Sequence, residues 1–264
     1  MNIFSAPPKK TLLSQIQNLN ITSAVVSALA AIASLIFLVP ASINFVLSYM
    51  AQDDLVNSPQ IVLAPASKVL FSPQAKYVLA AIFFATAVFS LLLATKLKAR
   101  YDRTVKAGIS GFRWLLIGVS AGLMLEFTSI LAGINDVMTL KLIGAMILVT
   151  TILGWISDRE NSKPKSAHWL AYIASLFTGA LAWGPLLGAM FGTWYWGLER
   201  FGWWVYALAA ALFIGFVCYA LMQYWHLAGK KSWKDYLFVE RNFLAVDVAT
   251  KLAFALIVIV AFYK

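Results

Sequence analysis

Residues 247–262 read DVATKLAFALIVIVAF, part of a long apolar run that carries an aspartate and a lysine one helical turn apart. A membrane-spanning helix needs about 20 mostly apolar residues. Lys251 lies far from either end of the run, and a charge at mid-bilayer costs about 2.5–3.5 kcal/mol or more. Asp247 lies on the same helical face. The pair is either a structural ion pair or a reactive amine that forms a Schiff base beside its counterion.

Six further apolar stretches lie upstream, separated by short polar breaks. The chain has 264 residues, of which 61% are hydrophobic and 12% charged. Soluble domains carry about 25% charged residues, so a soluble enzyme and a disordered chain are excluded. The only cysteine, Cys218, excludes an internal disulfide. We expect an all-α membrane protein with one domain, residues 1–264, and seven spans over 21–49, 76–97, 108–134, 137–157, 168–192, 203–227 and 238–263.

The distribution of basic residues predicts how the spans are oriented. Fourteen lysines and arginines fall on the side of the N-terminus and five on the other side. Loops rich in basic residues stay in the cytoplasm, so we expect a multi-pass protein of the cell membrane with its N-terminus inside and its C-terminus outside. The net charge of +10 is thereby explained without a nucleic-acid partner, and contact with membrane lipid remains open.

The first outer connection, about residues 50–75, is too long for a tight turn. It contains Pro59, Pro65 and Pro73 around an apolar run at 61–63. This composition favours a short hairpin on the membrane surface, with a mobile connection as the alternative.

Several stretches, taken in order, resemble the heliorhodopsins, a family of microbial-type retinal-binding rhodopsins. They are FRW at 112–114, LGW at 153–155, YALMQYW at 219–225 and GKKSWKDYLFVER at 229–241, with Lys251 ten residues after Arg241. The inside N-terminus and the long first outer loop match as well. The resemblance implies a seven-helix rhodopsin bundle, all-trans retinal bound to Lys251, isomerisation by light and a homodimer.

The chain departs from the family pattern at positions close to the expected Schiff base on Lys251. The family has a glutamate counterion three residues after the arginine of FRW, where this chain has Leu116. The family also has buried histidines in its first two helices. The matching positions in this chain are Ser27 and Ser90. Asp247 stands where the family usually has a small neutral residue. We therefore expect Asp247 to be the counterion, as a divergent feature of this chain.

Candidate pocket residues come from three helices. Four aromatic residues match family positions that flank the retinal polyene, and three residues share a helical face with Arg113. Simple packing is the alternative interpretation for all of them. These candidates are Trp183, Phe213, Phe216 and Tyr219 in the first group and Trp114, Ser120 and Met124 in the second.

Three functions compete. The leading one is a light sensor that does not pump and that signals to a cytoplasmic partner, because the residues beside Arg113 offer no titrating acceptor. The second is a light-gated or light-driven proton transporter that uses Glu126, which lies about 20 Å beyond Arg113 at 1.5 Å per residue. The third is a pigment-free scaffold. No metal-ligand set, phosphate loop or nucleophile–base pattern indicates an enzyme.

Overall fold

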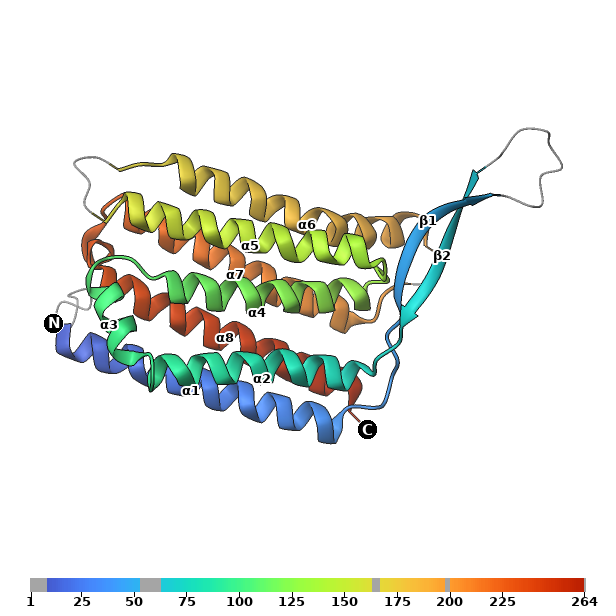
Figure 1. Ribbon diagram of the computed structural model, residues 1–264, viewed down its shortest axis with the longest axis horizontal. Helices are drawn as coiled ribbons and strands as arrows, with labels where there is room; N and C mark the ends of the chain where they lie inside the picture. The colour runs from blue at the N-terminus through green and yellow to red at the C-terminus, as the bar shows by residue number, and fades with distance from the viewer. Residues whose placement is uncertain (1–8, 53–62, 163–166, 198–199, 264) are drawn as a thin grey trace.

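The computed structural model describes residues 9–52, 63–162, 167–197 and 200–263. Within these ranges, seven helices are long and apolar enough to cross a membrane. They run side by side along the long axis of the molecule (Figure 1). Their bounds are α1 Lys9–Phe37, α2 Ala75–Ala94, α4 Gly111–Leu131, α5 Val137–Glu160, α6 Leu170–Trp196, α7 Trp203–Leu227 and α8 Tyr236–Phe262. The seven-helix bundle expected from hydropathy is confirmed.

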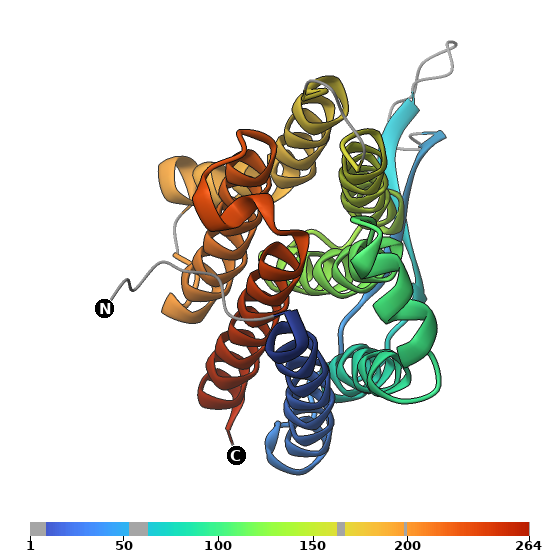
Figure 2. The same cartoon turned by 90° about the vertical axis from the view of Figure 1, so that its left-hand side faces the viewer.

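The two ends of the bundle differ in what connects the helices. At one end α1, α4, α6 and α8 begin, and the short helices α3 (Lys98–Lys106) and η1 (Lys231–Lys234) lie there too (Figure 1). We call this the basic end. At the other end, a two-stranded hairpin projects beside the helices (Figure 1), and we call this the hairpin end. Seen end-on (Figure 2), α4 lies in the middle of the bundle, and it contacts α2, α5, α6, α7 and α8.

The first helix differs from the prediction. It was expected over residues 21–49, but α1 spans Lys9–Phe37 and the chain enters a strand at Phe45. Proline has no N–H to donate and disfavours helix in the residue before it, so Pro40 prevents continuation. At the other end, Leu12 and Ile16 are at most 1% exposed and pack in a cluster with Tyr101. Tertiary packing therefore extends the helix into a segment that is too polar to be recognised by hydropathy.

The connection between the first two spans is a hairpin, as one of the two interpretations of residues 50–75 expected. Strands β1 (Phe45–Gln52) and β2 (Leu63–Phe71) pair antiparallel, with Tyr49 opposite Ala66. The first strand begins earlier than expected, at Phe45. Residues 53–62, which include Pro59, lie outside the described residues. The ring centroids of Phe45 and Phe71 stack 4.6 Å apart at the base of the hairpin.

Asp136 joins the hairpin to the bundle. Its carboxylate accepts from the backbone N–H of Ser48 in β1 at 3.0 Å and from that of Thr139 in α5 at 2.9 Å, which makes it the N-cap of α5. The Val46 N–H also donates to the Asn135 carbonyl at 2.9 Å. The hydrogen bonds from the backbone N–H groups of Thr139 and Ser48 lower the pKa of Asp136 to about 2. One ionised side chain therefore fixes both the start of a helix and the position of a strand.

Candidate functional site

Lys251 and Asp247 form a buried pair on the inner face of α8. Lys251 is 1% exposed and Asp247 3%, and the Nζ–Oδ2 distance is 2.5 Å. Their spacing of four residues places both side chains on one face, as the sequence indicated. A buried charge without a partner is strongly destabilising, so each of the two residues depends on the other.

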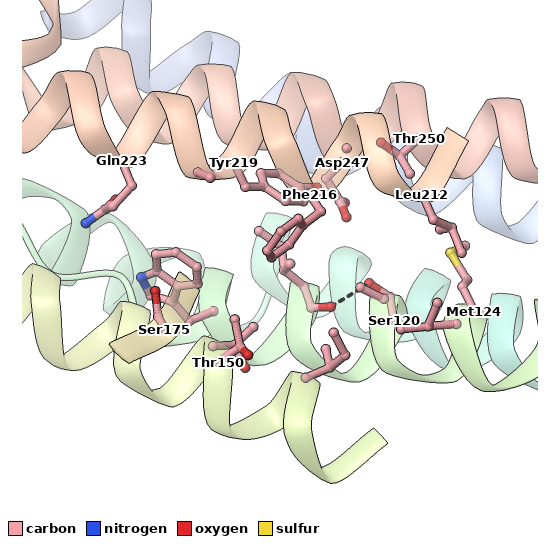
Figure 3. Close-up of a pocket in the computed structure, with 18 of the residues that line it drawn as sticks. Ser120, Met124, Thr150, Ser175, Leu212, Phe216, Tyr219, Gln223, Asp247 and Thr250 are labelled. Carbon is pink, nitrogen blue, oxygen red and sulfur yellow. Dashed lines mark hydrogen bonds between the residues drawn. The ribbon is translucent and has the colours of Figure 1, made fainter. Parts of the chain in front are cut away.

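A cavity between α4, α5, α6, α7 and α8 contains this pair. The space between its lining atoms is about 890 Å³, part of it open to the surroundings. Figure 3 shows the lining as two facing rows, with Gln223 at one end and Leu212 and Met124 at the other, and with Asp247 between them. The walls are mainly apolar, as is usual for pockets that hold an apolar ligand.

The aromatic walls depend on two glycines. A Cβ on Gly179 of α6 would lie 2.5 Å from Cε2 of Phe216, and one on Gly154 of α5 would lie 2.6 Å from the ring of Trp114. Real Cβ contacts are never this short, so the absence of side chains at these two positions lets the rings lie against the neighbouring helices. Trp183, 4% exposed, completes this part of the wall.

Most of the predicted pocket residues line the cavity. In addition to Lys251 and Asp247, these are Trp114, Ser120, Met124, Trp183, Phe216 and Tyr219. Phe213 is not among the lining residues. It is 44% exposed, and its ring contacts Trp183 edge to face with the centroids 5.3 Å apart. Phe213 therefore supports the wall from outside the cavity.

Arg113 lies in a separate cluster at the basic end. It is 0% exposed and forms ion pairs with Asp158 of α5, at 2.7 Å, and with Glu240 of α8. Its carboxylate partners are therefore these two residues, whereas the carboxylate of Asp247 pairs with Lys251. These contacts therefore assign Arg113 to the ion cluster at the basic end and not to Asp247.

Sequence reasoning missed both carboxylates of this cluster. Asp158 is 1% exposed and Glu240 0%, and neither residue was assigned a role from the sequence. Asp158 follows directly after the predicted fourth span, and Glu240 is the third residue of the predicted last span. Their nearness to span ends concealed their burial, and the unpaired arginine of FRW was the one indication that a partner carboxylate was needed.

Hydroxyl groups complete the cluster around Glu240. Its carboxylate accepts from the hydroxyl of Ser110 at 2.7 Å and from that of Tyr101 of α3. Burial, together with the negative charge of Glu240, raises the pKa of Tyr101 well above its usual range. The Tyr101 hydroxyl therefore stays protonated and acts as a donor at neutral pH.

Asp158 connects this cluster to the cavity. Its carboxylate accepts from Trp114 Nε1 at 2.7 Å, from Gln223 Nε2 at 2.9 Å and from the Tyr236 hydroxyl at 2.5 Å. Both Trp114 and Gln223 also line the cavity. The basic end of the cavity is therefore closed by side chains that are bonded to a buried ion cluster.

Glu126 lies away from the cavity lining, towards the hairpin end of α4. Its carboxylate pairs with Lys141 of α5 at 2.7 Å. A Cβ on Gly144 would lie 2.1 Å from a Glu126 oxygen, so this glycine makes room for the carboxylate. The side chain of Lys141 is 62% exposed, whereas that of Glu126 is 12% exposed.

The two serines that the resemblance matches to family histidines are buried between α1 and α2. Ser90 and Ser27 are both 0% exposed. The Ser90 and Ser23 hydroxyls are 3.1 Å apart and bond to each other. The two positions therefore carry hydroxyl groups that do not titrate near neutral pH.

A comparison with protein-family models matches the heliorhodopsin family over residues 16–262. The chain belongs to the heliorhodopsin family. No curated protein matches it. As a heliorhodopsin, the chain is a retinal-binding rhodopsin and a multi-pass membrane protein of photoreceptor type. The resemblance carried by FRW, LGW and the 219–241 region is thus confirmed.

The cavity of this heliorhodopsin fits retinal in its chemistry. Retinal is a long apolar chain with one aldehyde, and it requires a primary amine inside an apolar, elongated space. In the cavity lining, Lys251 supplies the amine and Trp183, Phe216 and Tyr219 supply aromatic walls. The fit supports Lys251 as the site of attachment.

Proposed function

We propose that this heliorhodopsin is a light sensor that binds all-trans retinal at Lys251 and pumps no ion. The observation that carries the proposal is the isolation of the buried Lys251–Asp247 pair. Among the described residues that line the cavity, Asp247 is the only carboxylate. A pump needs further proton-binding groups that lead from this site to each surface.

When bound, retinal supplies the absorption of visible light and a change of shape on isomerisation. Lys251 binds it through Nζ, and the Asp247 carboxylate, 2.5 Å from Nζ, stabilises a proton at that atom. Trp183 and Phe216 restrict the space beside the bound chain. These residues bind and orient the retinal, and the buried pair holds the proton in place.

Towards the hairpin end, aromatic packing closes the interior. Phe254 lies three residues after Lys251, and its ring contacts those of Phe83 and Phe127 at centroid distances of 6.3 Å. All three are at most 1% exposed. This packing makes the interior apolar on that side of Lys251, which favours a sensor over a pump.

A proton transporter is the second candidate, because Glu126 is a partly buried carboxylate in the hairpin half of α4. Voltage clamp of cells that express the protein separates the two functions. The sensor gives no steady current under continuous light. A steady photocurrent that Glu126→Gln abolishes would establish transport instead.

Retinal binding at Lys251 is tested with the purified full-length chain and added all-trans retinal. We expect a visible absorption band and, after borohydride reduction and digestion, a retinyl mass on the peptide that contains Lys251. Lys251→Ala should lose both while its helical circular dichroism is retained. Lys141→Ala, which removes an exposed lysine of α5, is the matched control and should retain both. A protonated visible band in Lys251→Ala would refute the assignment.

We further propose that the basic end faces the cytoplasm, that a cytoplasmic partner reads the signal and that the chain forms a homodimer. The excess of lysine and arginine at the basic end supports the orientation. The hairpin, held to α5 through Asp136, offers a surface for contact between copies. A monomeric mass both in mild detergent and in lipid nanodiscs would contradict the dimer.

A further inference from the structure

A second hollow lies on the outside of the bundle, between α7 and α8 and separate from the central cavity. Its lining includes Cys218, Met222 and Trp225 of α7, Trp233 of η1 and Ala249 of α8. On each helix the lining residues lie within eight positions, 218–225 and 242–249, which corresponds to about 10 Å at 1.5 Å per residue. The small side chains of Cys218 and Ala249 leave a shallow groove that runs along the helices.

The groove ends at the basic end among positive charges. Lys230 and Lys234 are exposed on the connection between α7 and α8, and Trp233, which precedes Lys234, lines the groove. Asn242 also lines it, and its Oδ1 accepts from the Arg241 guanidinium at 2.9 Å. We define the cationic rim as Lys230, Lys234 and Arg241. Arg241 is bonded to the groove-lining Asn242, and Lys234 follows the groove-lining Trp233. The Lys230 ammonium lies at the same end of the bundle, 5.6 Å from the centre of the Tyr224 ring.

The nearby carboxylates do not neutralise this rim. Asp235 accepts from the Leu237 N–H at 3.0 Å and is the N-cap of α8. Glu240 is fully buried and forms an ion pair with Arg113. The charge of Glu240 is compensated by Arg113, whereas Asp235 keeps its negative charge while it caps α8. Three cationic side chains beside this one carboxylate leave the rim with a net positive charge.

We propose that the groove binds an anionic phospholipid, with an acyl chain between α7 and α8 and the phosphate at the cationic rim. Charge complementarity selects this occupant, since basic side chains near a membrane surface attract acidic lipids. A second copy of the chain fits less well, because a two-fold contact through this groove brings the same patch of both copies together. The two cationic rims would then lie close to each other.

The test uses the purified full-length chain and native mass spectrometry, with phosphatidylglycerol and phosphatidylcholine of identical acyl chains as probes. Each basic side chain near an anionic surface strengthens binding by about fivefold. We expect Lys230→Gln/Lys234→Gln to weaken phosphatidylglycerol binding by about tenfold or more. Phosphatidylcholine binding should change little. Ala249→Phe, which fills the groove, should weaken the binding of both lipids.

Lys96→Gln/Lys106→Gln is the matched control, because it removes two exposed lysines beside α3 at the same end of the bundle. This control should retain the binding of phosphatidylglycerol. An equal loss in the control would show that general surface charge, and no particular site, attracts the lipid. Equal binding of the two lipids, or a dimer that only Ala249→Phe dissociates, would also overturn the proposal.

Discussion

Asp247→Asn tests the electrostatics of the proposed retinal site most directly. The carboxylate lies 2.5 Å from Lys251 Nζ, and both residues are at most 3% exposed. Two unit charges about 4 Å apart interact by about 4 kcal/mol at an effective dielectric constant of about 20. Removal of the negative charge therefore destabilises the proton at Nζ by about 4 kcal/mol, a factor of about 1000 in its binding constant.

The assay is an absorbance titration of the purified, retinal-loaded protein. With the carboxylate present, the visible band persists through neutral pH. In Asp247→Asn, the pH at which half of the band is lost should fall by about three units. At neutral pH the absorbance then moves to the near-ultraviolet, and any fraction that stays protonated absorbs at longer wavelength.

Glu126→Gln is the matched control, because Glu126 pairs with Lys141 and lies outside the cavity lining. Its visible band should be nearly unchanged. If Glu126→Gln loses the band and Asp247→Asn keeps it, the reasoning from the buried pair is wrong.

Three further predictions concern the surroundings of the site. Asp158→Asn should lower the free energy of unfolding by about 3 kcal/mol, the low end for breaking a buried pair, because Arg113 keeps its second carboxylate partner; thermal unfolding measures this. The pKa of Asp136 in the folded protein is about 2, below its usual value. The ionised carboxylate therefore stabilises the fold fully above about pH 4, and this stabilisation is lost as the pH falls towards 2. Amide exchange in β1 would detect the loss. Gly179→Ala should displace the Phe216 ring, destabilise the fold by about 1–3 kcal/mol and lower the amount of visible pigment.

Each of these predictions has a control in the same chain. Asp102→Asn removes a partly exposed pair with Lys98, and such pairs contribute about 0–1 kcal/mol. Asp136→Asn should abolish the loss between pH 4 and 2. Gly188→Ala places a Cβ where nothing lies within 4 Å and should leave the pigment unchanged. If Asp158→Asn were no more damaging than Asp102→Asn, the buried cluster would have no role in stability.

Six of the seven spans were predicted to within four residues at each end, because hydropathy is a local property of the chain. Both the start and the end of α1 were missed by twelve residues. The segment around Leu12 and Ile16 is polar on average, and only contact with the Tyr101 cluster makes it part of the bundle. Such a contact joins distant parts of the sequence, and no local pattern reveals it.

The candidate site likewise contains contacts that the sequence predicted and contacts that it did not. Lys251 and Asp247 share one helix, so their spacing alone predicted their contact. Asp158 and Glu240 meet Arg113 across three helices, and their partners could not be inferred without the packing of α4, α5 and α8. Phe213 was assigned by resemblance to family positions, and its exposure depends on how α7 is rotated in the bundle.

The shared use of Trp114 and Gln223 has a consequence for how a change of shape in the cavity reaches the surface. Both side chains line the cavity and also donate to Asp158. A displacement of either one removes a hydrogen bond from a buried carboxylate, which costs about 1.5–3 kcal/mol for a charged acceptor. A cost of that size alters the population of bundle arrangements by at least tenfold. A change of shape at the cavity wall therefore alters the stability of the ion cluster at the basic end.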